Sequence, residues 1–324
     1  MHTLEQLHEY VNQLFDTDKF TGEPHNLFDP VAYTMQQGGK RLRPTLLLAA
    51  TEMFGGNIDL SRSAALGIET FHNFTLLHDD LMDQSPTRRG KPTVYTKWNP
   101  NTAILSGDAM TAIAWQFMLQ IDNINKNRIL HTFNEMCMDI YRGQQYDMDF
   151  ETRQDVTIGE YMEMINLKTA ALISNALKIG ALHTDTKEEN IDGISRFGTA
   201  IGLAFQLRDD LLDAYGDESK LGKATWSDIR DNKKTYLFLL ATQKADPCTS
   251  AQLKDLFSTK PDDCSEKIRT VLCIYDRLSI KAEVENKIDE YQTEAQQILD
   301  SIETNESNKA TIRRIASSLV DRQI

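Results

Sequence analysis

The spacing of proline is the feature that most limits what this chain can fold into. No proline occurs between Pro100 and Pro247, and that span is filled with Ala, Leu, Ile, Met, Gln and Glu. Proline disrupts helix interiors whereas these six residues tolerate them well, so the span predicts stacked helices. Strand signals are weak, because alternating runs of Val, Ile and Thr are few and the hairpin dipeptide Asn-Gly is absent. We therefore predict an all-α fold.

Apolar periodicity predicts a series of helices joined by short polar segments. Two of them, around residues 66–81 and 191–212, are apolar most of the way round and are expected at the centre of a bundle. No linker rich in Pro, Ser or Gly divides the chain, so we expect one domain over residues 1–324. The expected helices lie at residues 4–16, 31–54, 60–83, 101–122, 126–150, 158–181, 188–216, 233–245, 249–257, 263–302 with a break near 278–282, and 307–322.

Composition and charge exclude several classes of protein. The net charge of −13 argues against nucleic acid as a partner, since that ligand requires a basic surface. The four cysteines lack zinc-ligand spacing and are interpreted as reduced thiols of a cytoplasmic protein. The longest strongly apolar run, Leu46–Ala50, is too short to cross a bilayer, and the N-terminus has no apolar signal-peptide segment. We expect a soluble cytoplasmic protein without a membrane span.

Two acidic clusters share one pattern, in which two acids are followed by two apolar residues and a third acid. They are Asp79-Asp80-Leu81-Met82-Asp83 and Asp209-Asp210-Leu211-Leu212-Asp213. Each follows a long apolar run, so each is expected at the C-terminal end of a core helix. Like charges four residues apart destabilise a helix by a few tenths of a kcal/mol, roughly, and carboxylates at that end face the negative pole of the helix dipole. Carboxylate oxygens select hard cations such as Mg²⁺. The clusters therefore predict divalent cations and a polyanion held by them.

Basic residues accompany both acidic clusters. One cluster is Gly38-Gly39-Lys40-Arg41-Leu42-Arg43-Pro44, a second is Arg88-Arg89-Gly90-Lys91 just after Asp83, and Gly222-Lys223 follows the downstream acids. Arginine forks match phosphate oxygens, and glycine lets the backbone approach an anion closely. The repeated order of acid and then base indicates a bound phosphate or diphosphate.

In these blocks the chain resembles the trans-isoprenyl diphosphate synthases, from about Phe28 to Lys234. The resemblance implies an all-α isoprenoid synthase bundle with a central apolar cavity, and a Mg²⁺-dependent prenyltransferase that condenses isopentenyl diphosphate with dimethylallyl, geranyl or farnesyl diphosphate. It also implies a homodimer, which helices around 101–150 that are apolar on more than one face support. Further motifs that carry the resemblance are Glu69-Thr70-Phe71-His72, His78 before the first acids, Ser106-Gly107-Asp108, Gly143-Gln144 with Asp147, Lys168-Thr169, Phe205-Gln206, Asp228 and Asp231-Asn232-Lys233.

The resemblance assigns a role to single residues. Direct ligands of three Mg²⁺ ions would be Asp79, Asp83 and Asp209. Further ligands, or holders of metal-bound water, would be Asp80, Asp210 and Asp213. Departure of the allylic diphosphate leaves a cation, which apolar walls would shield from water and which the carbonyl dipoles at Lys168-Thr169 and the Gln206 side chain would stabilise.

The diphosphates themselves would be held by basic side chains. The allylic diphosphate would bind Arg88, Lys168 and Lys223, with Lys233 as a further positive charge nearby. Isopentenyl diphosphate would bind Lys40, Arg43, His72 and Arg89. One departure from the family pattern is Trp226, which stands where glycine is expected in the loop after Lys223.

Product length is expected to depend on the residues before Asp79. At about 100° per residue, Thr75 lies nearly beneath Asp79, while Phe71 and Phe74 are turned from it by about 80° and 140°. A small Thr75 leaves room below the site, and Phe74 resembles the residue that forms the floor of the family's product tunnel. The first acidic cluster also lacks the two-residue insertion of many bacterial farnesyl synthases. Geranylgeranyl diphosphate is the expected product, with farnesyl diphosphate second and longer chains third.

Three other functions fit the sequence less well. A terpene cyclase would lack the second acidic motif and the isopentenyl site at Lys40, Arg43 and His72. A metal-dependent phosphohydrolase suggested by His78-Asp79 would need several metal-binding histidines near acids, and His78 is better explained as a packing residue. A non-catalytic subunit of a heteromeric synthase would have lost some of the six acids, whereas all are present.

Overall fold

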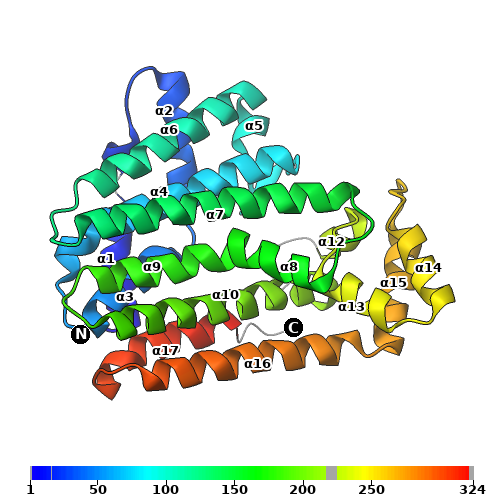
Figure 1. Cartoon of the computed structure of the whole chain (residues 1–324). Helices are drawn as coiled ribbons and strands as arrows, with labels where there is room; N and C mark the ends of the chain where they lie inside the picture. Colours follow the sequence, from blue (N-terminus) through cyan, green and yellow to red (C-terminus); the bar gives the residue numbers. More distant parts are fainter. Residues whose placement is uncertain (1, 16, 217–224, 321–324) are drawn as a thin grey trace. The chain divides into compact units, whose positions relative to one another are not determined.

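The computed structural model describes residues 2–15, 17–216 and 225–320 of the chain. Helices make up almost all of its regular structure (Figure 1). The described residues contain two strands, each of two residues. The predicted all-α fold is therefore confirmed. By their contacts, residues group into a first unit, Met1–Asn134, Asn175–Ile194 and Ile302–Ile315, and a second unit, Glu135–Ser174, Ser195–Ser301 and Ala316–Ile324. One domain over residues 1–324 stays a prediction.

The first unit is built around one long helix, α4. This helix buries residues along most of its circumference and packs chiefly against α6 and α3, as its apolar sequence predicts. Gly67 allows the close approach of α6, since a Cβ atom there would lie 2.8 Å from the sulfur of Met118. The elements of this unit are α1 (Leu4–Leu14), η1 (Thr17–Phe20), α2 (His25–Gln36), α3 (Leu42–Met53), α4 (Ile58–Met82), β1 (Thr87–Arg88), β2 (Lys91–Pro92), α5 (Val94–Lys97) and α6 (Pro100–Leu119).

The helix predicted over residues 31–54 is wrong, because two helices occupy this region. α2 ends at Gln36 and α3 begins at Leu42. Between them Gly38, Gly39 and Arg41 have φ angles of 73°, 134° and 42°. A right-handed helix cannot continue through such residues. The glycine pair is therefore a break that the apolar periodicity did not reveal.

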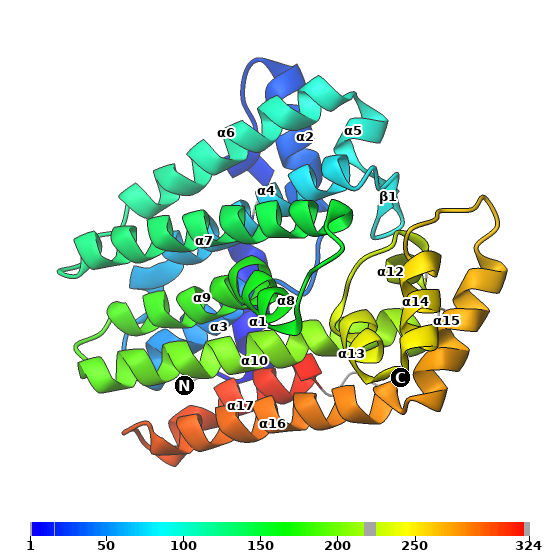
Figure 2. The same cartoon turned by 45° about the vertical axis from the view of Figure 1, so that its right-hand side comes forward.

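The second unit contains most of the C-terminal helices (Figure 2), and four helices, α7, α9, α10 and α17, have residues in both units. The break expected near 278–282 is present, since α15 ends at Arg277 and Ser279 has a φ of 56°. The remaining elements are α7 (Lys126–Thr152), α8 (Ile158–Ile165), η2 (Asn166–Ala170), α9 (Ala171–Leu182), α10 (Glu188–Tyr215), α12 (Ser227–Arg230), α13 (Tyr236–Lys244), α14 (Pro247–Leu256), α15 (Ser265–Arg277), α16 (Ile280–Ser301) and α17 (Glu306–Val320).

A π-helical turn, η2, interrupts the helix predicted over residues 158–181. The amide of Ala171 donates to the carbonyl of Asn166, five residues back, instead of four. α10 packs closely on this turn, because a Cβ atom at Gly202 would lie 2.5 Å from the Cα atom of Ala170. Single π turns within α-helices are frequent at functional sites.

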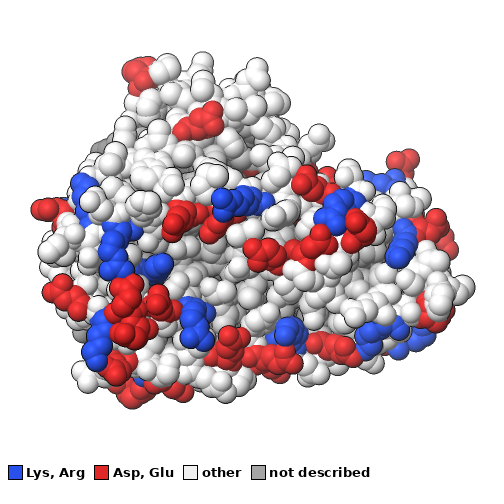
Figure 3. Space-filling view, in the orientation of Figure 1, with Lys and Arg blue, Asp and Glu red and all other residues white. Residues whose placement is uncertain are grey.

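On the face shown in Figure 3, Lys and Arg side chains stand among Asp and Glu side chains. Within the described residues of that face they form no continuous basic surface. Among the described helices, none is both long enough and apolar enough to span a membrane.

Candidate active site

The first acidic cluster lies where the sequence predicts it, at the C-terminal end of α4. Asp79 and Asp80 belong to the last turn, and Asp83 is the residue that ends the helix. Arg88 of β1 reaches both carboxylates of that turn, with its Nε atom 2.8 Å from Asp80 Oδ1 and an Nη atom 3.6 Å from Asp79 Oδ2. Burial raises the pKa of Asp80 to about 6, although Arg88 opposes that shift. Arg88 thus supplies positive charge to this acidic cluster.

A second group of charges surrounds Arg43 at the start of α3. Burial lowers the pKa of Arg43 to about 10, and Glu69 opposes that shift. Burial, followed by the charges of Arg43, Arg89 and Arg88, holds the pKa of His72 well below its usual range. His72 is therefore a neutral imidazole at neutral pH, able to donate or accept a hydrogen bond. The predicted isopentenyl residues Arg43 and Arg89 therefore lie close enough to His72 for their charges to lower its pKa.

Two loops with left-handed backbone meet beside this group. Arg89 has a φ of 53° and donates through Nη1 to the carbonyl of Gly38. A Cβ atom at Gly39 would lie 2.7 Å from the Arg89 guanidinium. Both glycines thus suit the positive φ angles of this loop, and Gly39 is also required for the space that Arg89 occupies. Lys40, which follows the pair, is exposed on the same loop.

The two groups of the first unit are adjacent. A small pocket is lined by Asp80, Arg88 and Arg89, together with Asn73 of α4 and Thr34 of α2. Asn73 donates to Glu69 Oε1 at 3.1 Å, while Glu69 Oε2 is buried without a hydrogen-bond partner. The acidic cluster and the group of basic residues around Arg43 and Arg89, which also contains Glu69, therefore lie side by side. Neither Glu69 nor Asn73 was predicted to belong to the site, although Glu69 lies in a motif that carries the family resemblance.

The second acidic cluster lies near the end of α10, and its three carboxylates have different surroundings. Asp210 accepts hydrogen bonds from the Tyr161 hydroxyl and from Gln206 Nε2, the latter at 2.9 Å. Burial raises the pKa of Asp210 to about 7, an effect that these hydrogen bonds oppose. Asp213 is buried and accepts from the Ser227 amide and hydroxyl at 3.2 and 2.5 Å and from the Asp228 amide at 3.0 Å. Asp209, in contrast, is partly exposed.

The π turn η2 places Lys168 and Thr169 beside residues that lie near the second acidic cluster. Lys168 Nζ is 2.6 Å from Asp147 Oδ2 of α7. Thr169 donates to Gln206 Oε1 at 2.8 Å, so one hydrogen-bonded series runs from Thr169 through Gln206 to Asp210. Burial alone would raise the pKa of Asp147, but Lys168 and then Lys233 bring it below its ordinary value.

The segment after α10 returns to the acids at Trp226. Its amide donates to the Asp213 carbonyl at 2.7 Å, and it has a φ of 61°. This left-handed angle explains why the family pattern has glycine here. Lys233 lines a pocket with Asp210, Asp213 and Asp228. Lys223, predicted to bind diphosphate, lies outside the described residues.

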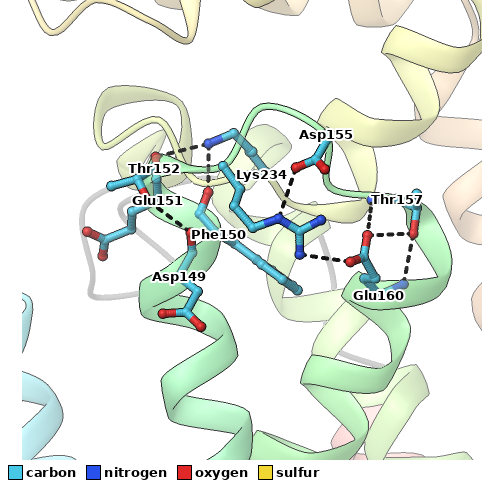
Figure 4. Close-up of polar contacts among 9 residues, drawn as sticks. Asp149, Phe150, Glu151, Thr152, Asp155, Thr157, Glu160 and Lys234 are labelled. Carbon is cyan, nitrogen blue, oxygen red and sulfur yellow. Dashed lines mark hydrogen bonds and ion pairs between the residues drawn. The ribbon is translucent and has the colours of Figure 1, made fainter.

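Lys234, which follows Lys233 in the sequence, has a different role in the structure. Lys234 is buried and donates to the carbonyls of Phe150 and Glu151 at 2.7 and 3.0 Å. Figure 4 shows its side chain at the C-terminal end of α7. A lysine there satisfies carbonyls that have no partner within the helix and complements the helix dipole.

The predicted chain-length residues lie on α4, directly before the acids. Phe71 and Phe74 are buried, with ring centroids 5.3 Å apart, and Phe71 also meets Phe133 of α7 at 5.6 Å. Thr75 turns its hydroxyl back to the carbonyl of His72 at 2.8 Å. His78 stacks edge-on with Phe74 at 4.7 Å, in keeping with the packing role predicted for it.

The sequence motifs of both units lie within the part of the chain that matches one enzyme family. The profile of the polyprenyl synthetase family matches residues 24–275. This chain belongs to the polyprenyl synthetase family. It is therefore an enzyme of the prenyltransferase class, and the resemblance found in its motifs is confirmed.

Individual members of the polyprenyl synthetase family align closely with the chain. A geranylgeranyl diphosphate synthase of Methanosarcina mazei is 40% identical over 223 residues, 68% of this chain and 69% of that protein. A geranylfarnesyl diphosphate synthase of Natronomonas pharaonis is 34% identical over 334 aligned residues, covering 97% and 95% of the two chains. A crystal structure of a geranylgeranyl pyrophosphate synthase superposes with a TM-score of 0.94 at 37% identity, covering 100% of each chain. The isoprenoid synthase bundle is thus the fold of this chain.

One solved polyprenyl synthase bears on the metal. The protein from Caulobacter crescentus, determined in complex with calcium and isoprenyl diphosphate, is 26% identical and superposes with a TM-score of 0.88, covering 99% of this chain and 98% of its own. Among the residues that the structure describes here, no three His, Cys, Asp or Glu side chains are grouped to hold a metal ion unaided. The donor set nevertheless suits Mg²⁺, which takes few protein carboxylates and fills its shell with water and phosphate oxygens.

Proposed function

We propose that the chain condenses isopentenyl diphosphate head-to-tail with an allylic diphosphate and extends it to geranylgeranyl diphosphate, releasing diphosphate. The observation that carries this proposal lies in the first unit. An acidic end with Asp79 and Asp80 adjoins a basic end with Arg43, His72 and Arg89. A diphosphate bound through metal ions suits the acidic end, and one bound directly by cations suits the basic end. Two diphosphates handled differently are what a chain-elongating prenyltransferase requires.

The acids would hold Mg²⁺, and three ions are expected. Asp79, Asp83 and Asp209 would be direct ligands, while Asp210 and Asp213 are better suited to hold the surrounding structure, because their oxygens already accept protein hydrogen bonds. When bound, the metal would neutralise the charge that develops on diphosphate as its C–O bond breaks. Arg88, which contacts Asp79 and Asp80, would add a positive charge to the binding of the allylic diphosphate.

The chain's own residues would direct the remaining chemistry. Lys168 and Lys233 would bind the allylic diphosphate, together with Lys223. The π turn changes the hydrogen-bond partners of its carbonyls, and carbonyls released in this way would stabilise the allylic cation near Thr169 and Gln206. The double bond of isopentenyl diphosphate would attack that cation, and a proton would then pass to the departing diphosphate. No side chain is needed as the base.

Substitution of Arg43 tests the division between the two diphosphates. Arg43→Met removes the charge from the basic end only, so the KM for isopentenyl diphosphate is expected to rise about a hundredfold while the KM for farnesyl diphosphate changes little. Steady-state kinetics with each substrate varied in turn gives both values. An equal rise in both KM values would mean that the basic end is not a separate site.

We further propose that the enzyme is a cytoplasmic homodimer, with α6 in the interface. Ile104, Leu105 and Leu119 of this helix are 47%, 59% and 55% exposed, and the part of the surface over α6 carries few charged side chains in Figure 3. Exposed apolar side chains on one helix are typical of an interface between subunits. Sedimentation velocity should give twice the chain mass, whereas Leu105→Glu should shift the protein toward monomer.

The product alternatives are farnesyl diphosphate and longer chains. A longer product is the stronger alternative, because a geranylfarnesyl diphosphate synthase aligns with nearly the whole chain. A non-catalytic subunit would form no product from any primer.

A further inference from the structure

The turn that presents Lys233 is fixed by an asparagine in a left-handed conformation. Asn232 has a φ of 62°. The amide of Lys233 donates to the Asp228 carbonyl at 2.9 Å, and the amide of Asn232 donates to that of Ile229 at 3.5 Å. This pair of hydrogen bonds is the Schellman arrangement that ends a helix, with Asn232 in the place usually taken by glycine. The direction of Lys233 therefore depends on Asn232 keeping this conformation.

A buried lysine from far along the chain holds that asparagine. Lys267 of α15 is only 4% exposed. Its Nζ atom donates to Asn232 Oδ1 and, at 3.0 Å, to the carbonyl of Thr259, and it lies 5.3 Å from the centre of the Phe257 ring. Lysine is rarely buried unless its ammonium group is fully satisfied. The Asn232 side chain is thus one of the hydrogen-bond acceptors that the buried Lys267 ammonium group needs.

The short helix α12 needs such support. It has four residues, too few for a stable helix without tertiary contacts. α15 contacts it, and Figure 2 shows the two close together. On the other side of the turn Lys234 is fastened to the end of α7 (Figure 4). Lys233 is therefore held between two anchored neighbours, and its side chain lines the pocket with Asp210, Asp213 and Asp228.

We propose that Lys267 is a positioning residue for the allylic diphosphate site, acting through Asn232 to fix the direction of Lys233. This inference rests on the proposed function, in which Lys233 binds diphosphate. Lys267 lies outside the sequence motifs that carry the family resemblance, which extend from about Phe28 to Lys234. α15 thereby contributes to diphosphate binding without touching the substrate.

A double-mutant cycle tests the proposal. Lys267→Met keeps the length of the side chain and removes the ammonium group. The KM for farnesyl diphosphate is expected to rise about tenfold, the size of effect that a small misplacement of a binding group produces, while the KM for isopentenyl diphosphate stays within about twofold. In a Lys233→Met background, Lys267→Met should cause no further rise, because both changes remove the same interaction. Lys267→Arg should restore part of the affinity.

A second readout does not depend on turnover. Inorganic diphosphate with Mg²⁺ should raise the Tm of the wild-type protein, and each variant's shift is compared with its own ligand-free Tm. Lys267→Met should lose most of the shift. The matched control is Lys260→Met, which breaks a 2.6 Å ion pair with Asp231 in the same turn but removes a side chain that is 62% exposed. Such surface pairs contribute little, so this control should keep the wild-type shift.

Two results would overturn the positioning role. One is an unchanged KM and an unchanged diphosphate shift in a folded Lys267→Met protein. The other is a full additional loss in the Lys233→Met background. Failure of the proposed function looks different, since the wild-type protein itself would then form no prenyl product and show no shift with diphosphate.

Discussion

At the scale of single residues, identical motifs separate into different roles. Asp209 and Asp213 belong to the same acidic motif, yet their surroundings differ. Asp209 is partly exposed, whereas Asp213 is buried and accepts three hydrogen bonds from residues 227 and 228. The spacing could predict that both lie on one helix. It could not predict which carboxylate serves the fold, because the partners come from a segment beyond α10.

Removing Asp209 should therefore affect mainly turnover, whereas removing Asp213 should affect mainly stability. Asp209→Ala should reduce turnover by about a thousandfold or more, since it removes a proposed metal ligand, while changing the free energy of unfolding by less than about 0.5 kcal/mol. Asp213→Ala should lower that free energy by about 1–3 kcal/mol, because buried donors lose their acceptor. Urea unfolding and single-turnover assays of both variants give these values. Near-normal turnover in Asp209→Ala would contradict its metal role.

The pKa of Asp80 predicts a pH dependence of stability. Burial raises this pKa to about 6, above the value of about 3.9 for an unfolded chain. The folded state then binds the proton more tightly, so Asp80 contributes stability at low pH that is lost as pH rises from about 4 to about 6. In metal-free buffer, the free energy of unfolding should fall over this interval more in the wild type than in Asp80→Asn. Parallel pH profiles of the two proteins would contradict the shift.

At the scale of elements, the helices follow from apolar periodicity and the interruptions do not. The ends of α4, α7 and α10 lie within a few residues of those predicted. The break at Gly38 and Gly39 and the π turn η2 were missed, since each depends on contacts made elsewhere in the fold. At Gly39 the contact is Arg89, and at η2 it is Gly143, where a Cβ atom would lie 2.4 Å from the Lys168 amide. Both interruptions carry predicted site residues.

The glycine pair offers a matched comparison at this scale. Gly38 and Gly39 both have positive φ angles, but a Cβ atom would meet nothing within 4 Å at Gly38 and would clash with Arg89 at Gly39. Either alanine substitution should cost about 1–2 kcal/mol of stability through backbone strain. Only Gly39→Ala should also raise the KM for isopentenyl diphosphate, by about tenfold, because it displaces Arg89. Equal KM values for isopentenyl diphosphate in the two variants would show that Arg89 does not bind this substrate.

At the scale of the whole molecule, the sequence motifs were enough to identify the family and its fold. They extend from about Phe28 to Lys234, and the C-terminal helices were predicted only as helical sequence. Their part in the structure, such as the contact of Lys267 with Asn232, could not be foreseen. Product length also belongs to this scale, because it depends on the depth of an apolar space and not on a motif.

Phe74 is the residue on which the product prediction depends. It is buried beside Phe71 and directly precedes the acids on α4. Phe74→Ala should lengthen the product by opening space under the site, at a cost of about 3–5 kcal/mol in stability typical of truncating a core phenylalanine. Chromatography of the dephosphorylated products measures the change. An unchanged product from a folded variant would place the floor at Phe71 or deeper.

The product formed by the purified wild-type protein tests the proposed reaction most directly. The protein would be incubated with Mg²⁺, labelled isopentenyl diphosphate and, separately, dimethylallyl, geranyl or farnesyl diphosphate, with a parallel set in EDTA. We expect one Mg²⁺-dependent product of twenty carbons from every primer. A twenty-five-carbon product would contradict the assigned tunnel floor, and the absence of any prenyl product would contradict the proposed reaction itself.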